Sequence, residues 1–295
     1  MYDFKALYEA ENVQDAIRLR LEHPEAQIIA GGSDVLVQIR EGRRAGVSLI
    51  SIFGLDELRG VTLEDGGTLR IGPLTSFSHI TRDPLVQRHI PVLGEAADQV
   101  GGPQIRNIAT IGGNVCNGAT SADSASTLFA WDAEVELTGQ DGVRCLPIPD
   151  FYLRAGAVDL RPGEILTGIL IPKTAYEGYR GHYIKYAMRS AMDIAICGCS
   201  VNVRLSDDGR SIENARIAYG VAGPVPVRCP AAEALARGAA VSEETVEAFA
   251  AAVLEDIRPR DSWRASKDFR EHIAVELARR AFRRAAGMEP EGGAV

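Results

Sequence analysis

The fold is decided by a glycine-rich stretch near the N-terminus, Gln27-Ile-Ile-Ala-Gly-Gly-Ser-Asp34. Its apolar residues predict a strand over 27–30, and helix-like spacing follows over 35–39. A glycine turn between a strand and a helix exposes backbone N–H groups, and glycine lets that backbone approach an anion without a Cβ in the way. Ser33 adds a hydroxyl donor. The stretch therefore predicts an α/β unit that binds an anionic ligand.

A second glycine pair lies in Thr110-Ile-Gly-Gly-Asn114. The apolar residues before it indicate another strand, so we expect a second turn with free N–H groups, the Thr110 hydroxyl and the Asn114 amide. Two such loops are suited to hold a pyrophosphate from two sides, which favours a dinucleotide. Neither loop matches G-x-G-x-x-G or a Walker A sequence. One Gly-Gly turn alone is more often only a turn, and the pair leaves the two interpretations about equally supported.

The rest of the chain predicts a mixture of helices and strands. Asn12 is a candidate N-cap for a helix over 13–21. Hairpin turns are predicted at Asp65-Gly66-Gly67 and Asp207-Asp208-Gly209. Further strands are predicted over 47–53, 133–138, 165–171, 183–186, 195–205 and 215–221, and helical stripes at Val246, Phe249, Ala250, Val253 and at Phe269, Ile273, Leu277, Ala281.

Length and charge narrow the class of protein. The chain has 295 residues, which favours two domains over one, and we place the boundary near 172–179. With 32 Lys+Arg against 40 Asp+Glu the formal charge is −8, which argues against a nucleic-acid binder because phosphate backbones demand a basic face. No segment approaches the roughly 18 apolar residues of a membrane helix, and no secretory signal is visible.

The five cysteines argue against a metal or disulfide framework. Their number is odd and none shows C-x-x-C spacing, so we expect reduced thiols in the cytoplasm and no zinc or iron–sulfur site in this chain. Cys197 and Cys199 are interpreted as small core residues on one strand face. No nucleophile–base constellation emerges around the five histidines, so we predict no catalytic residue and no metal ligand.

Four segments together resemble a known family. These are Gln27–Asp34, Gly102-Pro-Gln-Ile-Arg-Asn-Ile-Ala-Thr-Ile-Gly-Gly-Asn-Val-Cys-Asn-Gly-Ala-Thr-Ser-Ala-Asp-Ser124, Lys185-Tyr-Ala-Met-Arg-Ser-Ala-Met-Asp-Ile-Ala195 and Pro259-Arg-Asp-Ser-Trp-Arg-Ala-Ser-Lys267. They resemble the FAD-binding (medium) subunits of the molybdenum hydroxylases, and within that family the bacterial xanthine dehydrogenase branch. The resemblance implies an α+β fold. An FAD-binding domain of two α/β subdomains (residues 1–175, divided at about 55) precedes a C-terminal domain (residues 176–295) with a small antiparallel sheet and helices.

The resemblance also implies a set of FAD-binding residues. They are Gln27, Ile28, Ile29, Ala30, Gly31, Gly32, Ser33, Asp34, Thr110, Ile111, Gly112, Gly113, Asn114, Asp123, Ile165 and Lys185. Asp34 and Asp123 have an alternative interpretation as helix N-caps. Lys185 is either a surface lysine or the partner of a buried negative group, and the latter is favoured by its apolar strand. Arg189 and Asp193 match a loop near the flavin, and a salt bridge between them is the alternative.

The implied function is a redox relay. A partner subunit with a molybdenum cofactor hydroxylates a purine such as hypoxanthine or xanthine, a second partner carries [2Fe-2S] clusters, and the FAD held here passes the electrons to NAD. Such a complex is a cytoplasmic heterotrimer. The alternatives are the flavin subunit of a CO, nicotinate or aldehyde-oxidising enzyme and, from another class, a non-catalytic scaffold or cofactor-assembly protein.

Overall fold

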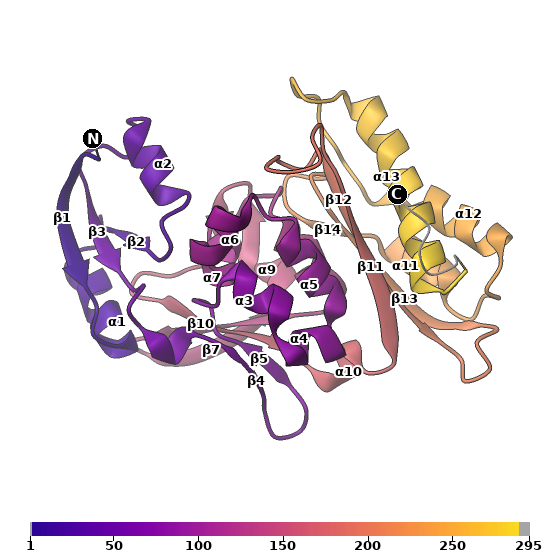
Figure 1. The fold of residues 1–295 in the computed structure, drawn as a ribbon, viewed down its shortest axis with the longest axis horizontal. Helices are drawn as coiled ribbons and strands as arrows, with labels where there is room; N and C mark the ends of the chain where they lie inside the picture. The colour runs from indigo at the N-terminus through magenta and orange to yellow at the C-terminus, as the bar shows by residue number, and fades with distance from the viewer. Residues whose placement is uncertain (1, 289–295) are drawn as a thin grey trace.

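Three main sheets lie in a row along the molecule, with helices between and around them (Figure 1). The computed structural model describes residues 2–288. The N-terminal sheet lies at one end and the C-terminal helices at the other, with a five-stranded sheet and its helices in the middle (Figure 1). This mixture of parallel and antiparallel sheets with helices confirms the expected α+β class.

The N-terminal sheet is parallel, as the predicted strand–helix alternation requires, because parallel neighbours need a crossover connection. Its strand order is β1 (Phe4–Glu9), β3 (Val47–Ser51), β2 (Gln27–Ile29), and its helices are α1 (Val13–Glu22) and α2 (Val35–Arg40). Leu19 of α1 packs on Ile50, and Ile39 of α2 packs on Leu49, so the two helices cover opposite faces. The predicted cap is confirmed, since Asn12 accepts a hydrogen bond from the Asp15 N–H at 2.9 Å.

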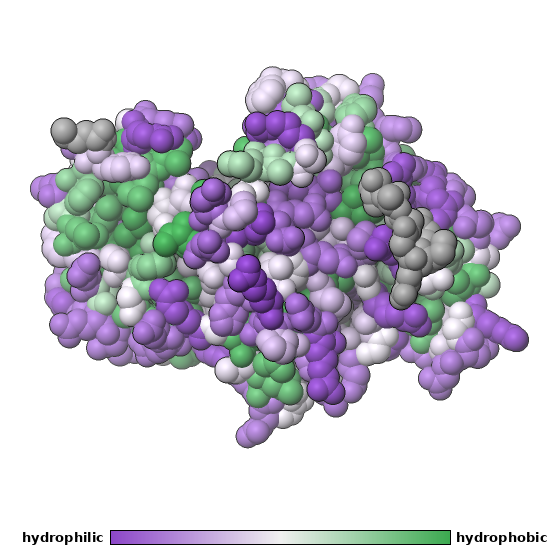
Figure 2. Space-filling model, viewed as in Figure 1, coloured by the Kyte–Doolittle hydropathy of each residue, from purple (hydrophilic) through white to green (hydrophobic). Residues whose placement is uncertain are grey.

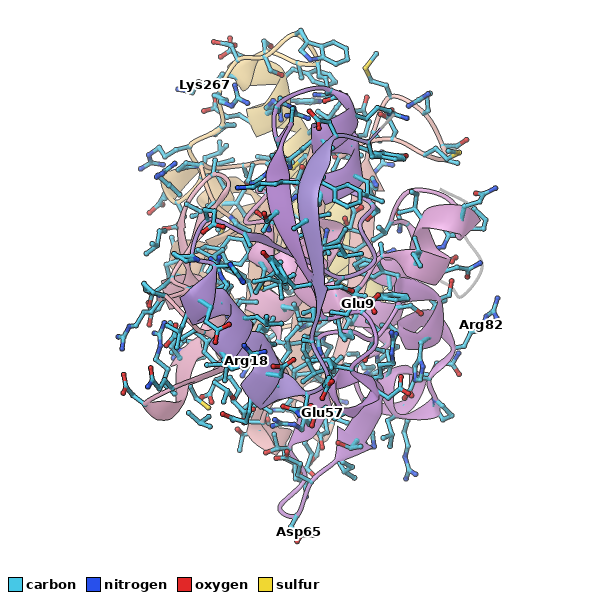
Figure 3. All side chains as sticks on the ribbon, turned by 90° about the vertical axis from the view of Figure 1, so that its left-hand side faces the viewer. Glu9, Arg18, Glu57, Asp65, Arg82 and Lys267 are labelled. Carbon is cyan, nitrogen blue, oxygen red and sulfur yellow. The ribbon has the colours of Figure 1, made fainter. Side chains whose placement is uncertain are left out.

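The middle sheet is antiparallel. Its order is β4 (Val61–Leu63), β5 (Leu69–Ile71), β10 (Ile165–Ile171), β6 (Glu134–Gly139), β7 (Gly142–Pro147). The central strand β10 is almost entirely buried, with Ile169 opposite Ile71 on one side and Val135 on the other. The predicted hairpin between β4 and β5 is confirmed, and Asp65 lies at its tip (Figure 3).

Short helices pack around this sheet. They are η1 (Asp56–Leu58), α3 (Phe77–Arg82), α4 (Pro84–His89), α5 (Pro91–Asp98), α6 (Pro103–Ile108), α7 (Ile111–Cys116), α8 (Asp123–Ala130), α9 (Ile148–Phe151) and α10 (Lys173–Tyr176), together with the small hairpin β8 (Tyr152–Arg154) and β9 (Ala157–Val158). Three of them begin with proline, whose missing N–H is no loss in a first helical turn. Phe77, Trp131 and Phe151 are fully buried in the resulting core.

The C-terminal part is a four-stranded antiparallel sheet with helices. Its elements are β11 (Tyr179–Tyr186), β12 (Cys197–Leu205), β13 (Ile212–Gly220), β14 (Val227–Arg228), α11 (Pro230–Ala236), α12 (Glu243–Ala252), η2 (Val253–Glu255) and α13 (Lys267–Ala285). Cys197 and Cys199 are buried in the core, as predicted. Phe269 is the exception in the predicted stripes, because it is 40% exposed and lies against Tyr186, with ring centroids 5.9 Å apart.

The interpretation of the second glycine pair as a turn after a strand is wrong. The segment before it is helix α6, which begins at Pro103, and the glycines form part of the first turn of α7. The glycine at position 112 serves a long-range contact instead of a turn, since a Cβ there would lie 2.4 Å from the Pro73 Cβ. This packing against a distant segment selects glycine, and local sequence patterns do not reveal it.

The surface is mostly hydrophilic in the view of Figure 2, with hydrophobic residues over the N-terminal sheet. Phe4 and Leu7 of β1 are among the exposed apolar side chains, at 41% and 48%. Within residues 2–288, no helix combines the length and the apolar character needed to cross a membrane.

Candidate cofactor site

The loop between β2 and α2 presents four consecutive backbone donors. Among the described residues, no acceptor is found for the N–H groups of residues 31–34 or for the Ser33 hydroxyl. Gly32 has φ +73°, a left-handed conformation that bends this backbone. Successive N–H groups in such a turn form a concave nest for anions. The geometry therefore supports the predicted anion site at this loop.

Polar side chains tie the two ends of the loop together from outside. The Arg44 guanidinium donates to the Gln27 and Gln38 side-chain oxygens, each at 2.5 Å. The Gln38 amide in turn donates to the Asp34 carboxylate. Asp34 occupies the N-cap position of α2, as its alternative interpretation predicts, but its side chain forms no capping hydrogen bond to the helix.

The two glycine stretches touch each other at Gly31. A Cβ on Gly31 would lie 1.8 Å from the carbonyl oxygen of Ile108 and 3.2 Å from the Cα of Ala109. Both are backbone atoms just before Thr110, and they cannot swing aside as a flexible side chain can. Only glycine fits at position 31, and its small size allows the donor loop to lie against the end of α6.

The second stretch does not offer free backbone donors, and that expectation is wrong. The N–H groups of Ile111 and Gly112 donate to the carbonyls of Thr75 and Pro73, at 3.0 and 2.8 Å. Thr110 is the N-cap of α7, and its side chain accepts from the Gly113 N–H at 3.2 Å. The Asn114 N–H donates to the Thr110 carbonyl at 3.0 Å. Only side-chain groups of this stretch are left to contact a ligand.

Asn114 connects this stretch to a buried ion pair. Its side-chain oxygen accepts from the Ser124 hydroxyl at 2.7 Å, while its amide nitrogen has no acceptor among residues 2–288. The neighbouring Asp123 pairs with Lys185 at 2.8 Å, and each side chain is only 8% exposed. The expectation that Lys185 reaches a buried negative group is confirmed, and the alternative of a surface lysine is wrong.

Asp123 is held by hydrogen bonds from two other side chains and does not cap a helix. Ala122 is the N-cap of α8 and forms no side-chain capping bond, so the N-cap alternative for Asp123 is wrong. Its two carboxylate oxygens accept from the Tyr183 hydroxyl and from Lys185, both at 2.8 Å. Burial raises the pKa of Asp123, and the charge and hydrogen bond of Lys185 oppose that shift. Lys185 also donates to the Gln99 carbonyl at 2.9 Å.

Two further predicted positions are Ile165 and the pair of Arg189 and Asp193. Ile165 is buried in an apolar cluster with Ile17 and Leu74, and it offers a ligand no polar side chain. Arg189 and Asp193 form the ion pair that was the alternative to a flavin role, with Nε and Oδ2 3.5 Å apart. The cofactor contact of Ile165 stays a prediction.

Sequence reasoning missed two residues of the site, Ser124 and Tyr183. Ser124 ends the quoted motif and is adjacent to Asp123, so its hydroxyl was a visible candidate. Tyr183 lies two residues before Lys185 on β11, and side chains two apart on a strand share a face. That period-two rule was the available signal.

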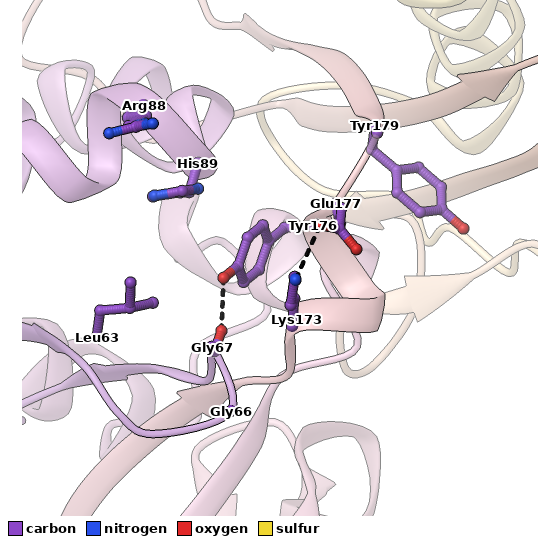
Figure 4. Close-up of a pocket in the computed structure, with 10 residues that line it drawn as sticks. Leu63, Gly66, Gly67, Arg88, His89, Lys173, Tyr176, Glu177 and Tyr179 are labelled. Carbon is purple, nitrogen blue, oxygen red and sulfur yellow. Dashed lines mark hydrogen bonds and ion pairs between the residues drawn. The ribbon is translucent and has the colours of Figure 1, made fainter. Parts of the chain in front are cut away.

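A cavity of about 560 Å³ lies elsewhere (Figure 4). It lies between the β4–β5 turn, the end of α4 and the segment 173–179, and none of the residues predicted to bind a cofactor lines it. Its polar groups contact one another, since Tyr176 donates to the Gly67 carbonyl at 2.5 Å and Lys173 pairs with Glu177 at 3.1 Å. This cavity is not the predicted site.

Comparison with known proteins identifies the family. Residues 2–174 match the FAD binding domain in molybdopterin dehydrogenase, and residues 182–285 match the CO dehydrogenase flavoprotein C-terminal domain. The chain therefore belongs to the FAD-binding (medium) subunits of the molybdenum hydroxylases.

Individual relatives agree with this assignment. A putative xanthine dehydrogenase FAD-binding subunit of Escherichia coli (strain K12) is 44% identical, covering 96% of both chains. The nicotinate dehydrogenase FAD-subunit of Eubacterium barkeri is 32% identical over 84% of this chain and 83% of its own. Among solved structures, carbon monoxide dehydrogenase of Hydrogenophaga pseudoflava matches with a TM-score of 0.91 and 30% identity, covering 98% of this chain and 99% of that one.

Proposed function

We propose that this chain is the FAD-holding electron-transfer subunit of a xanthine dehydrogenase-like complex. In that complex a molybdenum-cofactor subunit oxidises a purine such as hypoxanthine or xanthine, an iron–sulfur subunit with [2Fe-2S] clusters relays the electrons, and NAD is the final acceptor. Bound FAD supplies the conversion between one-electron and two-electron chemistry. This chain binds and orients the cofactor.

The observation that carries the proposal is the donor loop at residues 31–34. Four backbone N–H groups without an acceptor among the described residues fit a diphosphate, and they need no basic side chain. This arrangement also explains how a chain of formal charge −8 binds an anion. We propose that the loop holds the diphosphate, and that Asn114 and Lys185 face other polar groups of the cofactor.

The number of hydrogen-bond donors on Lys185 supports a contact with a ligand. An ammonium group has three N–H donors, and the described residues accept two of them, at Asp123 and Gln99. One donor on a side chain that is 8% exposed is left for a ligand oxygen.

The substrate and the acceptor rest on the relatives. The 44% identical protein from Escherichia coli is described as a xanthine dehydrogenase subunit, which favours a purine and NAD. The 32% identical nicotinate dehydrogenase subunit favours the alternative of a nicotinate-type enzyme, and the carbon monoxide and glyceraldehyde relatives favour a CO- or aldehyde-oxidising one. The division into residues 1–175 and 176–295, the heterotrimer and the cytoplasmic location belong to the same proposal.

Two measurements test the proposal. The purified chain is expected to bind FAD at one equivalent, followed by quenching of flavin fluorescence. A colourless chain without FAD affinity would favour the alternative of a scaffold or cofactor-assembly protein. The complex co-purified with its partner subunits is then assayed for NAD reduction with xanthine, nicotinate, an aldehyde or CO. Activity with xanthine alone supports the purine assignment, and activity with another substrate overturns it.

A further inference from the structure

Tyr183 is a buried polar residue beside the candidate cofactor site. Its side chain is 2% exposed, and its hydroxyl donates to Asp123 Oδ1 at 2.8 Å. Its backbone N–H donates to the Glu95 carboxylate at 2.9 Å, which fixes the strand at this residue. The hydroxyl therefore has one partner and little freedom to find another.

The neighbouring strand is shaped around this hydroxyl. Gly198 of β12 lies directly opposite Lys185 in the β11–β12 ladder. A Cβ on Gly198 would lie 2.9 Å from the Tyr183 hydroxyl oxygen, which is closer than a Cβ atom approaches a neighbouring heavy atom in folded proteins. The Tyr183 hydroxyl thus fits beside β12 only because residue 198 has no side chain.

The Tyr183 bond sets the orientation of the Asp123 carboxylate. One carboxylate oxygen accepts from Tyr183, so the other is turned toward Lys185 at 2.8 Å. A carboxylate held by two donors cannot rotate without losing one of them, and bonds to an ionised acceptor are stronger than neutral ones. The position of the Lys185 ammonium depends on that orientation.

We propose that Tyr183 is a positioning residue for the FAD site, acting through Asp123 on Lys185. This inference rests on the proposed function of the chain as an FAD-binding subunit. Without the Tyr183 hydroxyl, Asp123 is free to turn and the Lys185 ammonium follows it. The affinity for FAD and the reduction potential of the bound flavin then change, because a cation near a flavin stabilises its electron-rich reduced form.

The test compares Tyr183→Phe with a matched Tyr→Phe control. Tyr152 is also buried, at 5% exposed, but its hydroxyl has no hydrogen-bond partner in the described part of the chain. Tyr183→Phe is expected to weaken FAD binding by about tenfold and to shift the flavin midpoint potential, since it removes a bond to a charged group. Tyr152→Phe is expected to leave both unchanged.

A second variant reaches the same bond from the other side. Gly198→Ala displaces the hydroxyl while keeping the phenol, so it is expected to shift the potential in the same direction as Tyr183→Phe. The melting temperature of the FAD-free chain is measured for all variants. Wild-type affinity and potential in Tyr183→Phe, even with a lower melting temperature, would make Tyr183 merely structural and overturn the inference. Failure of the wild-type chain to bind FAD would instead overturn the proposed function.

Discussion

Replacing Gly31 with alanine separates the two glycine stretches by a distance that the structure specifies. The new Cβ would lie 1.8 Å from the Ile108 carbonyl oxygen, whereas carbon and carbonyl oxygen pack at about 3.3 Å or more, so the segments must part by about 1.5 Å. Overpacking of this kind costs about 1–3 kcal/mol. Where that strain opposes the bound state, FAD affinity falls by about 5- to 150-fold.

The assay is an FAD titration of the wild-type and variant chains, followed by flavin fluorescence. Gly54→Ala is the matched control, because a Cβ there meets no atom within 4 Å and its φ lies outside the left-handed region. We expect the control to bind FAD like the wild type. Wild-type FAD affinity in Gly31→Ala would refute the argument that this contact holds the donor loop in its binding geometry.

Three further predictions concern Thr110, Lys185 and Glu164. Thr110→Ala removes the cap on the Gly113 N–H and should lower the unfolding free energy by about 1 kcal/mol in urea titrations, whereas Thr110→Ser should restore it. Lys185→Met leaves Asp123 buried without its counter-charge and should lower the unfolding free energy by about 3–5 kcal/mol at pH 7. A decrease of less than about 1 kcal/mol would contradict this prediction and show that water screens the pair. Hydrogen bonds from Arg144 lower the pKa of Glu164 in the folded chain. The contribution of Glu164 to the unfolding free energy is therefore present above pH 4.5 and is lost as the pH falls through the lowered pKa. Glu164→Gln should flatten this acid limb of the stability curve, and an unchanged acid limb would contradict the assignment.

Asp123 has the opposite pH dependence. Its pKa is raised by burial, so the folded chain binds this proton more tightly than the unfolded chain does. Its contribution to the unfolding free energy therefore falls as pH rises from 3.8 through the raised value. The difference between the acid titrations of the wild type and of Asp123→Asn measures this component.

Local patterns were sufficient for the first glycine loop. The alternation of strand, glycine turn and helix at residues 27–39 follows from the local residue pattern, and the structure places β2 and α2 at these positions. The same holds for β10, whose apolar run matches the predicted strand 165–171. Such elements depend on neighbours in the chain, so the sequence alone predicts them.

The second stretch could not be predicted in this way. Whether the N–H groups of Ile111 and Gly112 are free depends on Thr75 and Pro73, which lie far away in the sequence. The contact of Gly31 with Ile108 is likewise invisible to any local pattern. The charge pair of Asp123 and Lys185 needed the packing of β11 against the helices before it, which no spacing rule gives.

Under the proposed function, one FAD molecule contacts both the Gly31 loop and Lys185, which is held in place by its ion pair with Asp123. The Gly31 loop belongs to the sheet at one end of the molecule, and Lys185 belongs to the sheet nearest the other end (Figure 1). A ligand that touches both links these ends without a covalent bond. The proposed binding of FAD would then stabilise only chains in which both ends are correctly folded. At a free FAD concentration of 100 times its dissociation constant, the native state gains about 2.7 kcal/mol, and chains that misplace either end forgo that gain.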